Sequence, residues 1–552
     1  MRRRARARSG GLCGSGAAAA AILAGLAASA LLTACSLAAP GQQASGSGSS
    51  VTSGTAGTSA AAGHDAAWVA DENAKPGTPG WTVADPAGDT ELAGYFGQVS
   101  VLAGEDATLY ATSTLGDYTL TAYRLGWYGG TGARAVWTSP TPVRGVPQPR
   151  AEVAADRTVT TRWQPSATVP TTGWPEGSYL VVLRAPGSGK ASYVPLVVRT
   201  GELRDRLVLD SANLSYQAYN QWGGHSLYKG PTGAFATRSH RVSFDRPYDR
   251  GGAMEHFKFE VPIVQRAERV AAEAGLNLGY TTAWDLDRRP GILAGARGLV
   301  TMGHDEYWTV PERDAVEQAR DAGTNLAFLG ANAAYWRVRL TDGTTGAGRT
   351  MVGYKDAGLD PVQGPATTAL WRGAPAPKPE NSLTGMLYEC FPARGPLVVR
   401  DASFFAFAAA KATDGATYPG LVGTEIDRAY PIAGTPKNVQ VVAHSPVPCA
   451  TKGQTYGDTT YYTATSGAGV FASGTMLWTA ALAGTTTGTG MTDRSVTFAR
   501  DVTDALLREM AKGPLGRDHP ATGNLAGLGA STSTEHGTGG PIGSGLVVTD
   551  DD

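Results

Sequence analysis

The alternation of short apolar segments with longer amphipathic ones between Gly201 and Gly330 constrains the fold more than any other feature of the chain. The short segments predict strands and the long ones predict helices, with strands at residues 206–210, 298–302 and 325–330 and helices at residues 260–274 and 311–322. Strands that alternate with helices of this length form βαβ units, so the pattern predicts a parallel sheet covered on both faces. Pro311 near the start of the second helix and Gly323 just past its end agree with these bounds.

The segment before this region has the pattern of an all-β domain. Short strands separated by Gly and Pro turns are predicted at residues 99–102, 107–112, 118–125, 178–185 and 193–198. Within them, apolar and polar positions alternate, as at Leu109 and Ala111, which marks strands with one buried face. The regular spacing predicts a β-sandwich over residues 81–200.

From residue 351 onward the pattern is mixed, and a last amphipathic helix is predicted over residues 493–512. We interpret this part as the remainder of the α/β domain, elaborated by β insertions and extending over residues 201–513. The predicted fold class is therefore α/β with an N-terminal all-β domain.

The first 35 residues predict export and lipid anchoring. A basic stretch of five arginines precedes an apolar run at residues 17–32, as in an export signal, and the run ends in Leu32-Thr33-Ala34-Cys35, which resembles a bacterial lipobox. We expect residues 1–35 to be a lipoprotein signal peptide with Cys35 as the lipidated residue. A plain secretory signal is the alternative, and the paired arginines leave Sec and twin-arginine export both open.

Composition separates the two ends from the part that can fold. Residues 36–80 are rich in Gly, Ser and Ala and predict a flexible linker, and residues 514–552 predict a disordered tail. The formal net charge of -1 argues against a nucleic-acid partner. After the signal no apolar run has the length of a membrane span, so lipid is the only membrane attachment that we expect. The expected location is the extracytoplasmic face of the cell membrane.

Four cysteines are present, of which Cys13 lies in the signal and Cys35 at the predicted lipid site. The remaining two, Cys390 and Cys449, suggest a disulfide in an oxidising compartment. A cysteine-based metal or nucleophile site is the alternative, although neither residue has another cysteine or a histidine at ligand spacing.

Polar and aromatic residues follow the predicted strands of the parallel sheet. In such sheets ligands bind beyond the carboxyl ends of the strands, which here are followed by residues 303–308 and by Gly330-Ala331-Asn332. Further upstream, residues 215–228 contain three tyrosines, and residues 243–248 and 254–257 add a phenol, two carboxylates and an imidazole. These loops are the candidates for a functional site, although tyrosine-rich loops are also common as packing with hydrogen-bonded hydroxyls.

Several ordered motifs between about Gly94 and Leu506 resemble one family. They are Tyr123-Arg124-Leu125-Gly126-Trp127-Tyr128-Gly129-Gly130, Gln217-Ala218-Tyr219-Asn220, Phe244-Asp245-Arg246-Pro247-Tyr248, Gly303-His304-Asp305-Glu306-Tyr307-Trp308 and Pro379-Glu380-Asn381-Ser382-Leu383-Thr384-Gly385. Together they are similar to the large subunit of N,N-dimethylformamidase. The resemblance implies an amide hydrolase with a mononuclear iron held by two tyrosines and one glutamate, on a catalytic core related to glutamine-amidotransferase-like α/β folds.

The resemblance also implies roles for individual residues. Glu306 would be the carboxylate ligand, and Tyr219 and Tyr248 the phenolate ligands, with Tyr216 and Tyr228 in reserve. His304 and Asn332 would lie beside the metal, and Glu425 would be a general base. Hard anionic oxygens suit a ferric ion, and a Lewis acid beside a carboxylate is suited to amide hydrolysis.

Two features of the chain differ from that family. The amidase is a soluble assembly with a small subunit, whereas this chain has an export signal and no evident small subunit; whether it forms a homo-oligomer stays open. The expected substrate is a small-molecule amide or a cell-surface component. A second hypothesis is a non-catalytic surface protein that binds carbohydrate or cell-wall material on the same fold.

Overall fold

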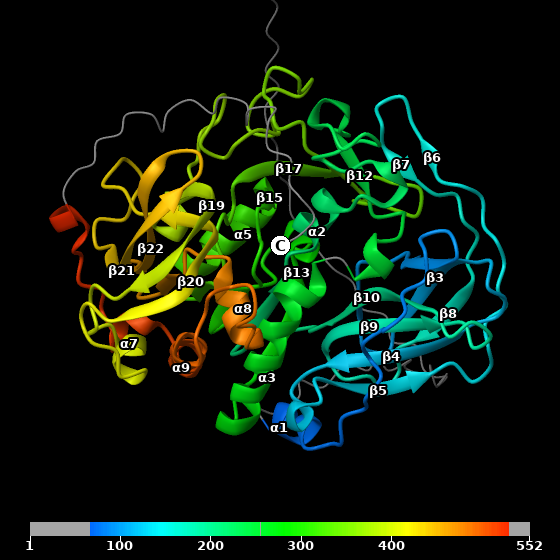
Figure 1. Ribbon diagram of the computed structural model, residues 1–552, viewed down its shortest axis with the longest axis horizontal. Coiled ribbons are helices and arrows are strands. Elements are labelled where there is room, and N and C mark those ends of the chain that lie inside the picture. The colour runs from blue at the N-terminus through cyan, green and yellow to red at the C-terminus, as the bar shows by residue number, and fades with distance from the viewer. Residues whose placement is uncertain (1–66, 254, 529–552) are drawn as a thin grey trace, which may run out of the picture. The chain divides into compact units, whose positions relative to one another are not determined.

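The computed structural model describes residues 67–253 and 255–528, whose elements are arranged as Figure 1 shows. The structure is a mixed α/β protein with more strand than helix, built from several sheets. The predicted signal peptide and the lipidation residue Cys35 lie outside the described residues. In the part of the chain that is described, no helix combines the length and apolarity that crossing a bilayer requires.

The N-terminal region contains a five-stranded sheet, β2-β10-β9-β4-β5, and a three-stranded sheet, β1-β3-β8. The strands are β1 (Leu92–Phe96), β2 (Ser100–Leu102), β3 (Asp106–Ser113), β4 (Thr119–Leu125), β5 (Ala133–Thr138), β8 (Ala167–Pro170), β9 (Gly177–Arg184) and β10 (Ala191–Arg199), with a separate pair of β6 (Glu152–Val153) and β7 (Val159–Thr160). Alternate residues of both sheets, including Leu109, Leu120 and Val181, form one buried apolar cluster. The period-two pattern therefore places the apolar side chains between the two sheets.

A nine-stranded sheet forms the centre of the remaining chain, in the order β13-β11-β14-β16-β23-β22-β21-β19-β20. Its first five strands are parallel and its last four antiparallel to their neighbours. The strands are β11 (Leu207–Ser211), β13 (Leu278–Thr282), β14 (Gly298–Thr301), β16 (Asn325–Phe328), β19 (Leu387–Val398), β20 (Thr417–Arg428), β21 (Gln440–Cys449), β22 (Gly453–Thr463) and β23 (Gly469–Ala472). The antiparallel strands β19, β20, β21 and β22 come from the part of the chain after residue 351, where the sequence pattern is mixed.

A smaller sheet, β12-β18-β17-β15, lies beyond the parallel strands. It consists of β12 (Arg241–Ser243), β15 (Tyr307–Thr309), β17 (Trp336–Thr341) and β18 (Thr350–Val352). Strand β15 directly follows the loop after β14, so this smaller sheet starts beyond the edge at which the parallel strands end.

Helices pack on the sheets and connect their strands. They are α1 (Trp68–Asn73), α2 (Asn213–Tyr219), α3 (Val261–Ala274), α4 (Ala283–Arg288), α5 (Val310–Asp321), α6 (Asn381–Thr384), α7 (Phe405–Ala409), α8 (Leu477–Ala483) and α9 (Asp493–Met510). Short 3-10 turns are η1 (Tyr128–Gly130), η2 (Trp222–Gly224), η3 (Phe235–Thr237), η4 (Arg250–Gly252), η6 (Leu515–Arg517) and η7 (Leu525–Leu528), and a π-helical turn, η5 (His256–Glu260), leads into α3. Helix α5 starts with a capping box between Thr309 and Glu312.

The predictions of a flexible linker over residues 36–80 and a disordered tail over residues 514–552 are wrong for the residues next to the folded part of the chain. The linker prediction to residue 80 fails at Trp68, because α1 buries Trp68 and Val69 in the core. The tail prediction from residue 514 fails because Leu515 and Leu525 are buried and the Asn524 side chain bonds to Val441. Isolated apolar residues in polar surroundings gave no periodic signal for either segment.

A fully buried ion pair joins β4 to α3. Arg124 Nη2 donates to Glu268 Oε1 at 2.6 Å, and the Asn73 amide and the Tyr280 hydroxyl also donate to this carboxylate. Glu268→Gln leaves the guanidinium without its counter-charge, so we expect the free energy of unfolding to fall by about 3–5 kcal/mol. Urea denaturation measures this, with Glu273→Gln in the exposed Arg269 pair as the control that changes stability by under about 1 kcal/mol.

Cys390 in β19 and Cys449 in β21 form a disulfide across the antiparallel part of the large sheet. It closes a loop with a sequence separation of 59, and restricting such a loop in the unfolded chain stabilises the fold by about 4 kcal/mol in the chain-entropy model. We expect the Cys390→Ser, Cys449→Ser double variant to unfold at lower urea concentration. Intact mass before and after reduction checks the bond, and two free thiols in the purified protein would contradict it.

Candidate functional site

The candidate site lies where the strand order of the parallel sheet reverses. Strand β11 comes first in the chain but lies between β13 and β14, so the connections that follow β11 and β13 pass to opposite sides. Loops diverge at such a point and leave room for a ligand beyond the carboxyl ends of the strands. The chain after β11 runs into α2 and ends that helix at Tyr219, and the chain after β14 leads to residues 303–306.

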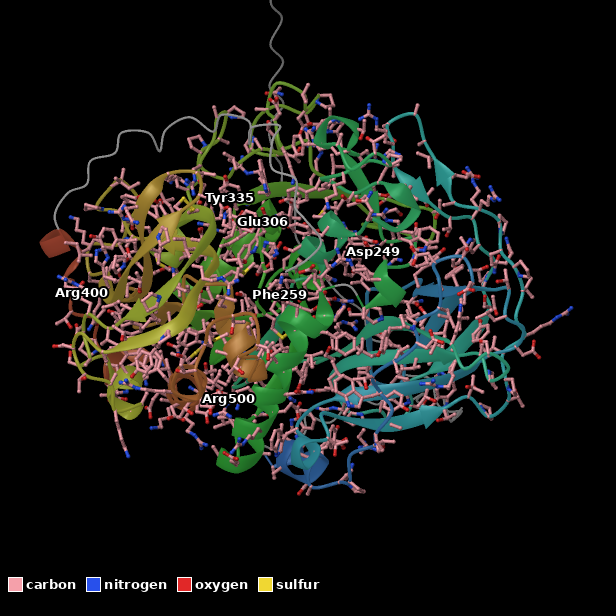
Figure 2. The ribbon with its side chains drawn as sticks, in the orientation of Figure 1. Asp249, Phe259, Glu306, Tyr335, Arg400 and Arg500 are labelled. Carbon is pink, nitrogen blue, oxygen red and sulfur yellow. A yellow bond between two sulfur atoms is a disulfide. The ribbon has the colours of Figure 1, made fainter. Side chains whose placement is uncertain are left out.

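Two phenols and one carboxylate meet at this edge. The Tyr219 hydroxyl donates to Glu306 Oε2 at 2.7 Å, and the Tyr228 hydroxyl lies 2.9 and 3.1 Å from Glu306 Oε1 and Oε2. The two hydroxyl oxygens are 2.9 Å apart, and the rings stack with centroids 4.5 Å apart. Figure 2 labels Glu306 close to Tyr335. Burial raises the pKa of Tyr335, and the negative charge of Glu306 raises it further. We call the side chains of Tyr219, Tyr228 and Glu306 the oxygen cluster.

The backbone around Glu306 is held by its neighbours. The amides of Glu306 and Tyr307 both donate to Ser215 Oγ, at 2.9 and 3.1 Å, which ties the loop to α2. Gly303 has a φ of 73°, and a Cβ there would lie 2.6 Å from the side chain of Phe259. Only glycine fits this turn without displacing Phe259, so the loop geometry follows from Gly303.

The loop that carries Tyr228 is organised by a buried arginine. Arg246 donates to the backbone carbonyls of Asn220, Trp222 and His225, at 2.8 to 2.9 Å. These three carbonyls lie between Tyr219 and Tyr228, so the guanidinium fixes the turn that brings the second phenol back beside the first. Burial lowers the pKa of Arg246 to about 10. The guanidinium is still charged at neutral pH, because this value lies well above 7.

His304 and Glu425 lie beside the oxygen cluster. His304 Nε2 is 3.4 Å from Glu306 Oε2 and 3.7 Å from Glu425 Oε2. Burial alone would lower the pKa of His304, but the hydrogen bond to Glu306 and the charge of Glu425 raise it to about 9. Burial raises the pKa of Glu425 to about 7, although the His304 charge opposes that shift. Glu425 is therefore a carboxyl that changes protonation near neutrality.

Asn332 joins this group from the loop after β16. Its backbone amide donates to Asp427 Oδ1 at 2.9 Å, its side chain helps to hold down the pKa of Glu425, and its Oδ1 is buried without a hydrogen-bond partner among the described residues. Asn332 has a φ of 61°, a left-handed conformation that asparagine tolerates better than most residues. The site thus contains a carboxyl from strand β20 and an amide from the loop after β16.

Lys355 is a site residue that the sequence did not indicate. Its Nζ is buried, lies 3.0 Å from the Tyr228 ring centroid and 5.1 Å from those of Tyr307 and Trp336, and has no hydrogen-bond partner among the described residues. Burial lowers the pKa of Lys355 well below its ordinary value, while the Glu306 charge opposes this. The only available signal was a lysine three residues after the short strand β18, and that pattern is common on protein surfaces.

The structure separates the predicted phenols into two groups. Tyr219 and the reserve candidate Tyr228 contact Glu306, whereas Tyr248 and Tyr216 pack against His256. Tyr248 is directed there because the Asn220 side chain binds the Pro247 carbonyl and the amide of Asp249. The choice of Tyr248 beside Glu306 is thus corrected in favour of Tyr228.

The oxygen cluster fits a small, hard metal ion. Metal–oxygen bonds of about 2.0 Å at right angles place neighbouring donor oxygens about 2.8 Å apart, close to the observed 2.7 to 3.1 Å. Two phenolates and one carboxylate would balance the charge of a ferric ion in a buried site. Burial and the Glu306 charge raise the pKa of both phenols well above the ordinary value, so without a cation they are protonated and donate to Glu306.

The fold and this site define an α/β protein with closely spaced oxygen donors at the switch point of a parallel sheet. Within that class, the chain belongs to the N,N-dimethylformamidase beta subunit-like family, since the C-terminal profile of the family matches residues 119–493. The family prediction from the motifs is therefore confirmed. No curated protein matches the chain.

Proposed function

We propose that this protein is an iron-dependent hydrolase that cleaves the C–N bond of linear amides. The observation that carries the proposal is the convergence of Tyr219, Tyr228 and Glu306 within 2.7 to 3.1 Å, beside Glu425 with a pKa near neutrality. Tyr219, Tyr228 and Glu306 would hold the ion. A ferric ion bound there would supply Lewis acidity toward an amide carbonyl.

The residues around the cluster suit the proton transfers of hydrolysis. Glu425 in its carboxylate form accepts a proton as the oxygen of a water molecule bonds to the carbonyl carbon. It returns the proton to the nitrogen as the C–N bond breaks, which releases a carboxylic acid and an amine. His304, protonated below about pH 9, balances the charge of Glu425 and Glu306. Asn332 Oδ1 is available to accept an N–H of a primary or secondary amide.

Metal analysis and an activity screen test the proposal on the purified full chain. We expect about one iron per chain, a visible absorption band from phenolate-to-iron charge transfer, and amine release from simple formamides. A folded protein that binds no iron and releases no amine would contradict the proposal and favour the non-catalytic binding hypothesis.

We further propose that the protein is an exported lipoprotein, acylated at Cys35 and attached to the extracytoplasmic face of the membrane. The Cys390–Cys449 disulfide supports an oxidising compartment. Its substrate would then be a small-molecule amide or an amide of the cell surface. Mass spectrometry of the membrane fraction should find acylated Cys35 as the N-terminus, and a mature chain that begins elsewhere would exclude the anchor.

We also propose that residues 81–200 and 201–513 are a β-sandwich domain and a catalytic domain related to glutamine-amidotransferase-like folds. The shared apolar cluster of the two N-terminal sheets and the parallel order β13-β11-β14-β16-β23 support this division.

A further inference from the structure

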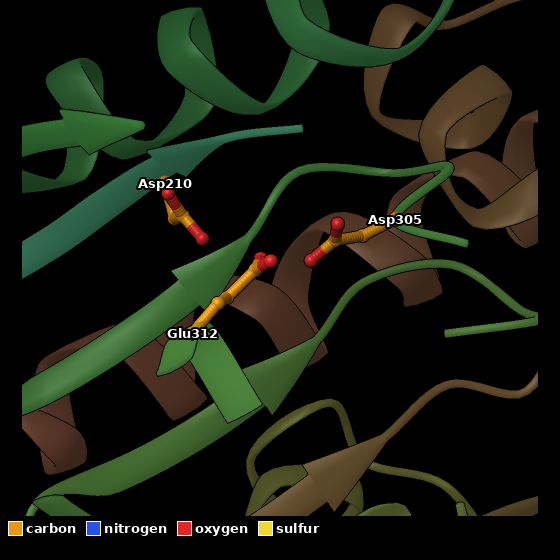
Figure 3. Close-up of side chains that lie close together, drawn as sticks. All are labelled: Asp210, Asp305 and Glu312. Atoms are coloured by element: carbon orange, nitrogen blue, oxygen red, sulfur yellow. The ribbon is translucent and has the colours of Figure 1, made fainter. Parts of the chain in front are cut away.

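A second group of acidic side chains lies apart from the oxygen cluster. Asp210, Asp305 and Glu312 come from strand β11, from the loop after β14 and from the first turn of α5, and Figure 3 shows their carboxyl groups pointing toward one another. One oxygen from each lies within 4.8 Å of the others. All three residues are completely buried, with 0% exposure.

These carboxyl groups lack the partners that buried acids require. Both oxygens of Asp210, both of Asp305 and Oε1 of Glu312 have no hydrogen-bond partner among the described residues. The sixth oxygen, Oε2 of Glu312, accepts the Thr309 amide in the capping box of α5. A buried carboxylate without a donor or a counter-ion costs several kcal/mol, so three together call for a cation or for bound protons.

A separate observation comes from the neighbouring strand. Thr281 in β13 pairs in parallel register with Asp210, so both side chains project from the same face of the sheet. The Thr281 hydroxyl is also buried without a hydrogen-bond partner among the described residues. A neutral oxygen without a partner, on the strand next to Asp210, offers a fourth oxygen donor and no positive charge, as in sites for hard cations.

We propose that Asp210, Asp305 and Glu312 bind a hard divalent cation of the Ca²⁺ or Mg²⁺ kind. The donor set consists of carboxylate oxygens with a hydroxyl nearby and contains no sulfur or nitrogen ligand, which favours these ions over zinc, because structural zinc sites are built mainly from cysteine and histidine. The ion connects three elements that are distant in sequence. Because Asp305 immediately precedes Glu306, the bound ion fixes the loop that presents Glu306 to the oxygen cluster. The role of the ion at this place is structural.

Cation binding to the wild-type chain is the first test. The purified full chain is stripped with a chelator, and Ca²⁺ or Mg²⁺ is then added in separate calorimetric titrations and thermal unfolding runs. We expect one of the two ions to bind with a stoichiometry of one per chain and to raise the unfolding temperature by several degrees. If neither ion binds or changes the unfolding temperature, the carboxyl groups share protons instead and the proposal is overturned.

Variants then locate the site. Glu312→Gln keeps an oxygen for the Thr309 amide but removes the charge, and Asp210→Asn removes a ligand from β11. Each should bind the ion at least about 100-fold more weakly, beyond the range for loss of an outer-sphere partner. The control is Asp321→Asn, 62% exposed on the same helix, which should bind as the wild type does. Wild-type affinity in a folded Glu312→Gln protein would exclude the assigned site, and if neither variant folds, the wild-type titration decides alone.

Iron content measured in the same samples keeps this proposal separate from the proposed catalytic function. Glu306→Gln should lose iron and still bind Ca²⁺ or Mg²⁺. A chain that contains iron but does not bind Ca²⁺ or Mg²⁺ contradicts only the proposed cation site. A chain that binds Ca²⁺ or Mg²⁺ but contains no iron contradicts only the proposed iron site.

Discussion

Glu306→Gln is expected to abolish iron binding and amide hydrolysis together. Glutamine is neutral and has one oxygen where Glu306 has two, and both of those oxygens contact the phenols. Because the change removes a direct ligand, we expect the affinity for iron to fall by more than the roughly 10–100-fold that loss of an outer partner costs. Iron analysis and the visible absorption band measure the loss, and amine release from a formamide follows the activity.

Two tyrosine variants with the same change in side chain show whether the oxygen cluster is the metal site. Tyr228→Phe removes a hydroxyl that lies 2.9 Å from Glu306, and we expect it to lose the absorption band. Tyr248→Phe removes an equally aromatic, half-buried phenol that packs against His256, and we expect it to keep iron and colour. The opposite result would move the site to Tyr248 and would refute the ligand assignment, whatever the activity of either variant.

Sequence reasoning located the loop at Glu306 because its signal is local. The apolar strand β14 ends at Thr301, polar residues follow from Gly303 onward, and the parallel arrangement brings such ends to one edge. The choice between Tyr228 and Tyr248 could not be made in this way. It depends on which backbone carbonyls Arg246 binds and on the Asn220 contact with Pro247, and neither contact has a sequence pattern.

Other elements were missed for related reasons. Strand β13 has the sequence Leu-Gly-Tyr-Thr-Thr, which has no apolar run, yet all of its residues are buried. Lys355 reaches the site only through tertiary packing, where it lies over the Tyr228 ring. Asp210 and Glu312 are separated by a hundred residues, and only the pairing of β11 with β14 brings them together.

Glu425→Gln should separate catalysis from metal binding. The side chain lies 3.7 Å from His304 and contacts neither phenol of the oxygen cluster, so iron content and colour should stay at wild-type values. Loss of a general base lowers rates by about 10²- to 10⁴-fold, and we expect the turnover number to fall in that range. A variant that retains the wild-type rate would remove Glu425 from the reaction.

The pH dependence distinguishes a base from a residue that only shapes the site. Burial raises the pKa of Glu425 to about 7, and only the carboxylate accepts a proton, so the wild-type rate should rise with pH and level off above about pH 7. Burial also raises the pKa of Asp427, to about 7, so the origin of that rise needs a control. Asp427→Asn alters the support of the Asn332 amide and should lower the rate while the rise near pH 7 stays. In Glu425→Gln the residual rate should be independent of pH in this range, because the group whose deprotonation produced the rise is gone.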